Sequence, residues 1–345
     1  MRLKSFLAPF LILVLVLSLA ACSTNVVSPE NTIKPPEDTQ SNSVKIMNEY
    51  RELMNKNSSP SEILKFTEAN IGNLNKEDAD TVVSGLIDIQ NKQLENYRDK
   101  LYSREMNAKT AAYSYEDLVN LKNIKDEDVK SLFENAFNDG YKLIAPEGMY
   151  DFELDYENLN SKFSGFVSEA MAAYLGIMAE QSKAHFATDG SLSITPDELA
   201  GRVVNAENFI EKYGDKPYAS EVKQLYNWYL PAYLLGLNNT PAFSYEDNTL
   251  KPEFLTSFKN SAAKYADSGL AKTLNEYIKL LEKNDLKKTR EVLEFVNKAA
   301  PSAQQSGAPV RVPAIDPSGA PVSAQAVEPS RAPVSAQAAE PSRAQ

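Results

Sequence analysis

Apolar residues recur at helical spacing through most of the chain, and this pattern limits its fold more than any other feature. In the segment 76–105 the repeating positions, at steps of three and four, are Val83, Ile87, Gln90, Leu94, Tyr97 and Leu101. A heptad-like seam of this kind predicts a long helix with one buried face, in which Gln90 is the polar exception. Asn75 precedes the segment as a favourable N-cap, with Asp78 three residues later.

The same periodicity predicts a series of further helices, at 44–56, 60–70, 114–121, 126–138, 167–183, 196–213, 220–236, 252–266, 268–283 and 286–299. Pro231 falls inside one of them and should kink or split that helix near Asn227. Only the stretch from Tyr141 to Leu154 alternates as a strand does, around an Ala-Pro-Glu-Gly turn at 145–148. The sequence therefore predicts a mainly α fold, a helical bundle or helical-hairpin array with one small β-hairpin.

The first 22 residues have the features of a secretory signal. Arg2 and Lys4 precede an apolar run from Phe6 to Leu17, which is too short to span a membrane comfortably. The only cysteine of the chain follows the small residues that end this run.

That cysteine completes the four-residue motif Leu19, Ala20, Ala21 and Cys22, which resembles the lipobox of bacterial lipoproteins. The resemblance implies cleavage before Cys22 and a diacylglyceryl group on its sulfur, with fatty acyl chains such as palmitate. It places the protein on the outer face of the bacterial cytoplasmic membrane. Removal of residues 1–21, which hold two basic and no acidic residues, changes the net charge from −11 to −13. Attraction to anionic lipid therefore cannot anchor the chain, and the acyl chains must do so.

The rest of the chain divides by composition. Residues 22–43 are polar and rich in proline, and are expected to form a flexible, disordered tether. An N-terminal helical region is expected at 44–138, and the β-hairpin with a second helical domain at 139–299. Residues 300–345 form a Pro/Ala/Ser-rich, low-complexity tail with a twelve-residue repeat (317–328 and 329–340), which is expected to be disordered.

Charge and rare residue types exclude several functions. An acidic chain is repelled by nucleic acid, so no nucleic-acid partner is expected. With one cysteine and one histidine, no disulfide or Cys/His metal cluster can form. The segment 189–194 does not meet the ligand spacing of an EF-hand and is expected to form a turn before a helix that starts at Thr195. No P-loop or glycine-rich dinucleotide motif is present, and we expect no metal and no cofactor.

Three groups of residues are candidates for chemistry or binding. Tyr226, Trp228 and Tyr229 could contact a ligand by stacking on sugar rings, although Tyr226 and Tyr229 follow an apolar helical stripe and Trp228 does not. Alternation places four carboxylates on one face of the second hairpin strand: Asp151, Glu153, Asp155 and Glu157. Such a row could serve a hydrolase, but it is more typical of a solvated edge strand. His185 is expected to be a surface or C-cap histidine.

Two regions resemble known proteins. The segment Ala206–Ala219 resembles the helix–turn–helix junction of tetratricopeptide-type repeats in bacterial envelope lipoproteins, without a second copy at the required spacing. The stretch 140–299 is similar to uncharacterised secreted proteins of Gram-positive bacteria, a resemblance that implies no activity. The sequence thus predicts a non-enzymatic interaction or scaffold protein of the cell envelope, whose partner is another envelope protein or a cell-wall glycan. The alternatives are a glycan- or peptide-binding module and a carboxylate-dependent hydrolase.

Overall fold

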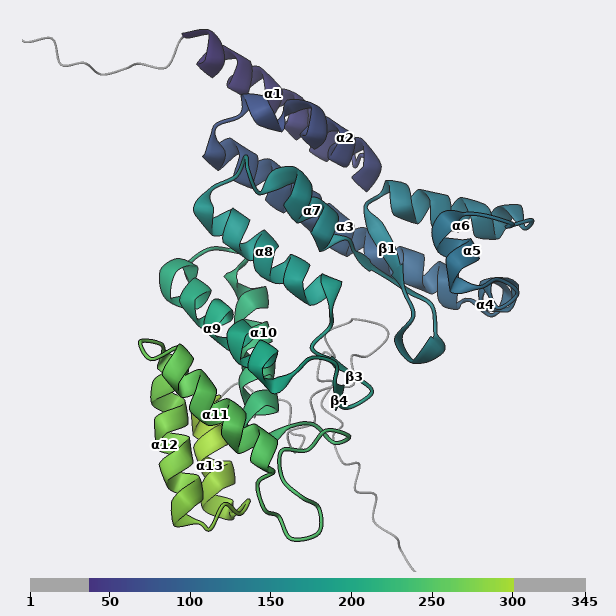
Figure 1. Ribbon diagram of the computed structural model, residues 1–345. Helices are drawn as coiled ribbons and strands as arrows, with labels where there is room; N and C mark the ends of the chain where they lie inside the picture. Colours follow the sequence, from purple (N-terminus) through teal and green to yellow (C-terminus); the bar gives the residue numbers. More distant parts are fainter. Residues whose placement is uncertain (1–36, 301–345) are drawn as a thin grey trace, which may run out of the picture.

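The fold is built almost entirely from helices, as the periodicity predicts. The computed structural model describes residues 37–300, in which helices follow one another along an extended body with two small β-hairpins (Figure 1). The helices are α1 (Glu37–Asn55), α2 (Pro60–Asn70), α3 (Lys76–Tyr102), α4 (Arg104–Thr110), α5 (Tyr115–Asn120), α6 (Glu127–Asn138), α7 (Tyr156–Phe163), α8 (Glu169–Lys183), α9 (Pro196–Tyr213), α10 (Ala219–Leu235), α11 (Pro252–Lys264), α12 (Gly269–Lys283) and α13 (Arg290–Ala299). The strands are β1 (Tyr141–Ile144), β2 (Asp151–Leu154), β3 (Ala187–Thr188) and β4 (Ser191–Leu192). The predicted mainly α class is confirmed.

Helix starts follow from side chains that satisfy the first free N–H groups. The Asn75 side chain accepts from the Asp78 N–H at 2.9 Å, so the predicted cap of α3 is confirmed. At the helix start predicted at Thr195, Thr195 and Glu198 form a reciprocal capping box, with Pro196 at the first position of α9. Ser59 and Glu62 form a second capping box at the start of α2, again with a proline first.

Several sequence expectations about the helices are wrong in detail. α1 begins at Glu37, so the last seven residues of the predicted tether are helical. α10 continues from Ala219 to Leu235 through Pro231 and is not split. The short helices α4 and α7 were not expected. The placement of Asp155 and Glu157 on the second hairpin strand is wrong: β2 ends at Leu154, because the Asp155 side chain accepts from the Asn158 N–H and starts α7.

The predicted β-hairpin forms in the expected place. β1 and β2 are antiparallel, with Tyr141 opposite Leu154 and Leu143 opposite Phe152, and a short 3₁₀ turn over Pro146–Gly148 joins them. A second hairpin, β3–β4, was missed because it has only two residues in each strand. Its turn at Asp189 and Gly190, both with positive φ, matches the turn that the sequence predicts there.

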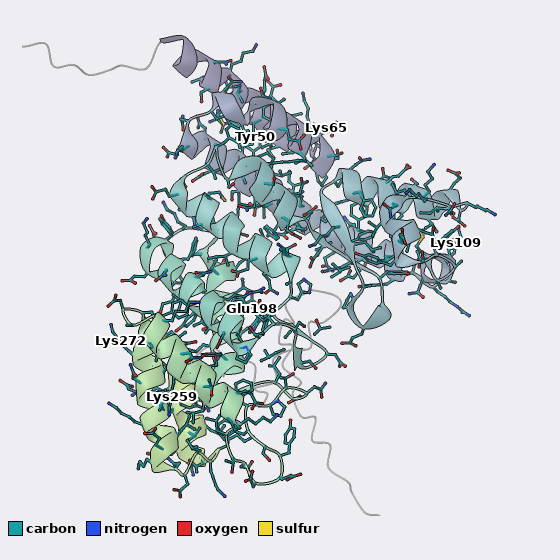
Figure 2. All side chains as sticks on the ribbon, viewed as in Figure 1. Tyr50, Lys65, Lys109, Glu198, Lys259 and Lys272 are labelled. Carbon is teal, nitrogen blue, oxygen red and sulfur yellow. The ribbon has the colours of Figure 1, made fainter. Side chains whose placement is uncertain are left out.

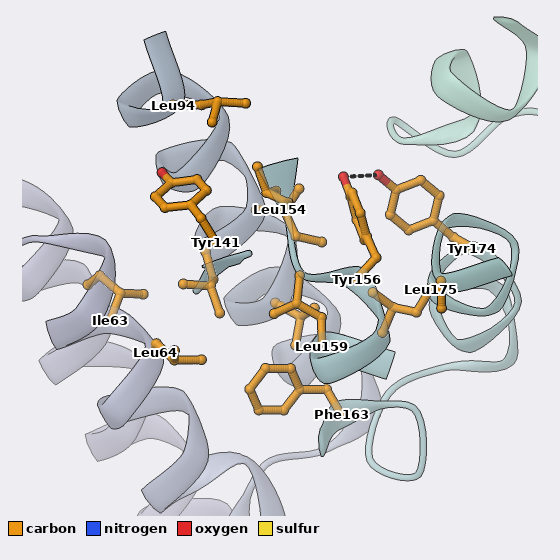
Figure 3. Close-up of a cluster of buried hydrophobic side chains, with 14 of the residues drawn as sticks. Ile63, Leu64, Leu94, Tyr141, Leu154, Tyr156, Leu159, Phe163, Tyr174 and Leu175 are labelled. Atoms are coloured by element: carbon orange, nitrogen blue, oxygen red, sulfur yellow. Dashed lines mark hydrogen bonds between the residues drawn. The ribbon is translucent and has the colours of Figure 1, made fainter. Parts of the chain in front are cut away.

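The first of two hydrophobic clusters joins the N-terminal helices to the hairpin. It contains buried residues of α1, α2, α3, α6, the β1–β2 hairpin, α7 and α8, some of which are shown in Figure 3. Phe152 of β2 is fully buried in it, and its ring centroid lies 5.1 Å from that of Phe133 and 6.0 Å from that of Tyr97. A bond between the hydroxyls of Tyr156 and Tyr174 links α7 to α8 (Figure 3). The hairpin is therefore packed on helices, as an isolated hairpin requires.

The second cluster packs α11, α12 and α13 against the N-terminal half of α9 and the C-terminal half of α10. The α9–α10 pair spans both clusters: Ala206 and Phe209 belong to the first, whereas Leu199 and Val203 belong to the second. The first cluster also continues across the predicted domain boundary between residues 138 and 139. We call the first cluster and its elements the N-terminal unit, and the second the C-terminal unit.

Candidate functional site

The predicted lipid-attachment motif lies outside the described residues. This applies to Leu19, Ala20, Ala21 and Cys22, to the signal peptide, to the tether before Glu37 and to the tail after Ala300. Within residues 37–300, no helix is both long enough and apolar enough to cross a membrane.

The aromatic residues of α10 are packed on the body of the protein. Tyr229 is only 1% exposed, and its hydroxyl donates to Gln181 Oε1 at 2.8 Å. Burial raises the pKa of Tyr229 to about 12. Tyr226 is half-buried where the two clusters meet, and Trp228 is half-buried against the second. A ligand could therefore reach Trp228 and part of Tyr226, but not Tyr229.

The carboxylate row is not the solvated face of an edge strand. Asp151 is 3% exposed, and its two oxygens accept from Nε and Nη2 of Arg98 at 3.1 and 3.2 Å. Burial disfavours the charged form of Arg98, but the carboxylates of Asp151 and Glu95 outweigh this effect and raise its pKa. The sequence interpretation was wrong because the strand packs on α3, whose Arg98 supplies the missing charge.

Glu153, the next carboxylate, lies in a small polar cluster on the same strand. Its Oε2 is 2.8 Å from His185 Nε2, and its Oε1 is 3.2 Å from Lys142 Nζ. Burial opposes the charge of Lys142, but Glu153 and Glu157 outweigh it and raise the pKa of the ammonium group. His185 thus lies directly after Ala184, the C-cap of α8, and its half-buried side chain joins this segment to β2. Asp155 and Glu157 have left the strand: the first caps α7 and the second lies in its first turn.

Ser182 makes this cluster superficially similar to a hydrolytic triad. Its hydroxyl donates to Glu153 Oε1 at 3.3 Å, while His185 binds the other oxygen of the same carboxylate. In a triad the imidazole must contact the serine hydroxyl to take its proton, and here the carboxylate lies between them. The arrangement therefore connects elements without activating a nucleophile.

Sequence reasoning missed a polar pocket of about 800 Å³ between α2, α3, α4 and α6. Buried Asp139, directly after α6, lies at its base: Oδ1 accepts from the Ser61 N–H at 2.9 Å, and Oδ2 from the Tyr97 hydroxyl at 2.7 Å. The amide of Gln90 donates to the Asp139 carbonyl at 2.9 Å. Gly140 has a positive φ, and a Cβ there would collide with the Gln90 amide. The polar Gln90 in an otherwise apolar seam was the one sequence signal that could have indicated this site.

A smaller pocket of about 410 Å³ lies beside Phe166, between α2 and α7. Its one lysine, Lys162, is paired with Glu68 at 2.6 Å. Among residues 37–300, no three His, Cys, Asp or Glu side chains are grouped to hold a metal ion. Comparison with protein-family models, curated proteins and solved structures finds no match to this chain.

Proposed function

We propose that this chain is a lipid-anchored interaction protein of the bacterial cell envelope, attached through Cys22 to the outer face of the cytoplasmic membrane. The lipobox resemblance, with the only cysteine of the chain at the required position, supports the anchor. Because the mature chain is acidic, it is not attracted to anionic lipid, and the acyl chains are the means of attachment.

An exposed apolar surface supports the interaction role. It is formed by Tyr115 and Val119, one turn apart on α5, and by Met149 and the half-buried Tyr150 of the hairpin, and we call it the hairpin patch. Tyr115, Val119 and Met149 are 46%, 41% and 52% exposed. Exposed apolar side chains that gather in one place are typical of protein interaction sites.

The hairpin patch is held rigidly by bonds between its two parts. The Tyr115 hydroxyl donates to the Leu143 carbonyl at 2.9 Å, and the Tyr150 hydroxyl donates to the Tyr113 carbonyl at 3.0 Å. The Tyr115 and Tyr150 rings lie 6.5 Å apart. A preformed surface loses little conformational entropy on binding, which favours a protein partner.

The two alternative functions have less support. A stacking site on α10 lacks Tyr229, whose ring is buried. A hydrolase needs two carboxyl groups about 5–10 Å apart facing a cleft. Asp151 and Glu153 are instead bound by Arg98, Lys142 and His185, and neither lines either pocket described above.

Site-specific crosslinking in intact cells tests the hairpin patch. A photoreactive benzoylphenylalanine at Met149 should give a discrete higher-mass adduct on irradiation. Tyr245 is a matched control, because it is 69% exposed and lies in a second copy of the sequence Ser-Tyr-Glu-Asp. Val119→Asp should strongly reduce the Met149 adduct. The same adducts at both positions, or none at Met149, would rule the patch out as an interface.

The anchor is tested separately. Cys22→Ala should release the protein into the medium or leave it unprocessed. Normal processing with unchanged membrane retention would contradict the anchor without affecting the crosslinking result.

A further inference from the structure

The polar pocket between α2, α3, α4 and α6 has the size of a ligand site. Its volume of about 800 Å³ lies within the range of small-molecule pockets, roughly 300–1,000 Å³. Such pockets are commonly lined by apolar residues, whereas most residues that line this one have hydroxyl, amide or charged side chains. Its lining suits a ligand with many hydrogen-bonding groups.

The base of the pocket is fixed by groups from three separate helices. Asp139 is 6% exposed, and its carboxylate is held by the Ser61 N–H of α2 and the Tyr97 hydroxyl of α3. The N-terminal end of α2 favours an anion at this position. Burial, followed by the bond to Asp139, raises the pKa of Tyr97, so the phenol keeps its proton. The base is therefore rigid before any ligand arrives.

The rim carries polar groups that the fold itself does not use. Lys65 and Lys100 are exposed and form no ion pair with the described residues, and Lys65 on α2 is labelled in Figure 2. The Lys100 ammonium lies over the Tyr97 ring, 5.8 Å from its centroid. Asn138 makes no side-chain hydrogen bond within residues 37–300. Lys162 at the smaller pocket differs from these two lysines, because its ammonium group already forms an ion pair with Glu68.

The pocket lining carries charges of both signs, and this selects the class of ligand. Asp99, Asp128 and Asp139 lie around it together with Lys65 and Lys100, and Asp128 shares Lys109 with Glu105 and Asp126. An anionic ligand would meet those carboxylates, and a cationic one would meet the lysines. A neutral ligand rich in hydroxyls can donate to the carboxylates and accept from the ammonium and amide groups. The partly exposed Met106 adds apolar surface for the C–H face of a sugar ring.

We propose that this pocket binds a short neutral oligosaccharide, with Lys100 and Asn138 as direct hydrogen-bond donors and Asp99 as an acceptor. Binding of a small ligand in this pocket requires neither the lipid anchor nor the protein partner of the hairpin patch. It also lies away from α10, where the sequence placed a sugar-binding candidate.

Titration calorimetry on the full lipid-bearing chain in detergent tests the proposal, with chitotetraose and maltotetraose as probes and tetraalanine as the peptide comparison. At least one tetrasaccharide should bind at up to about 10 mM. Lys100→Met and Asn138→Leu should each weaken binding about tenfold, the effect of losing one hydrogen bond of about 1.4 kcal/mol. Lys259→Met, at an exposed lysine of α11 labelled in Figure 2, should leave affinity unchanged. The three positions are exposed, so thermal unfolding should confirm that all variants remain folded.

The single tryptophan gives a second readout. Trp228 lies on α10, and its emission should not change when a sugar occupies the pocket. Failure of both tetrasaccharides to bind overturns the proposal. Binding that is unaffected by Lys100→Met and Asn138→Leu, or accompanied by a change in Trp228 emission that persists in those variants, places the site elsewhere. Binding of tetraalanine alone shows that the ligand class is wrong.

Discussion

The N-terminal and C-terminal units satisfy their buried polar groups in different ways. In the N-terminal unit, buried charges hold the elements together: Arg98 with Asp151, and Asp139 with Tyr97 and Ser61. In the C-terminal unit the comparable bonds are largely between neutral groups. The Tyr233 hydroxyl lies 3.1 Å from the Ser257 hydroxyl and 3.0 Å from that of Ser261, and Tyr277 donates to the Leu234 carbonyl. The one carboxylate in this network is Asp197, which accepts from the Ser257 hydroxyl.

This difference matters because the two kinds of bond fail differently. Removing one partner of a buried ion pair leaves an uncompensated charge in a medium that solvates it poorly. Removing one of several neutral hydroxyls leaves only uncharged groups behind, and their desolvation costs less. The N-terminal unit should therefore be fixed in one geometry but intolerant of substitution, whereas the C-terminal unit should be more tolerant.

The largest effect is expected from Arg98→Met. This change leaves the carboxylate of Asp151 buried without its cation and should lower the free energy of unfolding by about 3–5 kcal/mol. The double variant Arg98→Met/Asp151→Leu should recover part of that loss, since neither charge remains. Urea denaturation followed by circular dichroism measures both.

Arg202→Met is the matched control on α9. Arg202 is also buried, but it donates to the neutral amide of Gln181 at 3.0 Å, and its Nε lies 3.8 Å from Glu180, which is half exposed. Its loss leaves no buried charge and should cost only about 1–2 kcal/mol. Equal losses for the two arginine variants would remove the distinction between the units.

A smaller difference is expected between two tyrosine variants. Tyr97→Phe removes a hydroxyl that donates to the buried Asp139 carboxylate and should cost about 1.5–3 kcal/mol. Tyr233→Phe removes a bond among neutral hydroxyls and should cost about 0.5–1.5 kcal/mol. Denaturation midpoints at constant slope provide the measurement, and a larger loss for Tyr233→Phe would reverse the comparison.

The sequence predicted those parts of the fold that depend on local pattern. The seam of α3, the caps at Asn75 and Thr195 and the β1–β2 hairpin all follow from spacing and from residues within a few positions of each other. The partners of the charged groups could not be predicted in this way. Arg98 and Asp151 are 53 residues apart, and Tyr97 and Asp139 are 42 apart, so their contacts depend on how the helices pack. The polar pocket was missed for the same reason, because its lining comes from four separate helices.

The smallest effect is expected at two helix caps, one in each unit, which should respond to pH in the same way. Glu62 and Glu198 complete the capping boxes of α2 and α9, and their pKa values are lowered by bonds from the backbone and side chain of Ser59 and Thr195. A carboxyl whose pKa is lowered by folding stabilises the protein above its ordinary pKa, near 4.5, and this contribution is lost as the pH falls through the lowered value.

Glu62→Gln and Glu198→Gln should therefore lower the melting temperature slightly at pH 7, and the difference from the wild-type chain should disappear well below pH 4. Differential scanning calorimetry at several pH values measures this convergence. A difference that persists in acid would mean that lost hydrogen bonds, rather than lost charge, cause the effect. If the melting temperature of only one variant approaches that of the wild-type chain in acid, the two caps are not equivalent. The N-terminal and C-terminal units would then differ in their exposed helix caps as well as in their buried bonds.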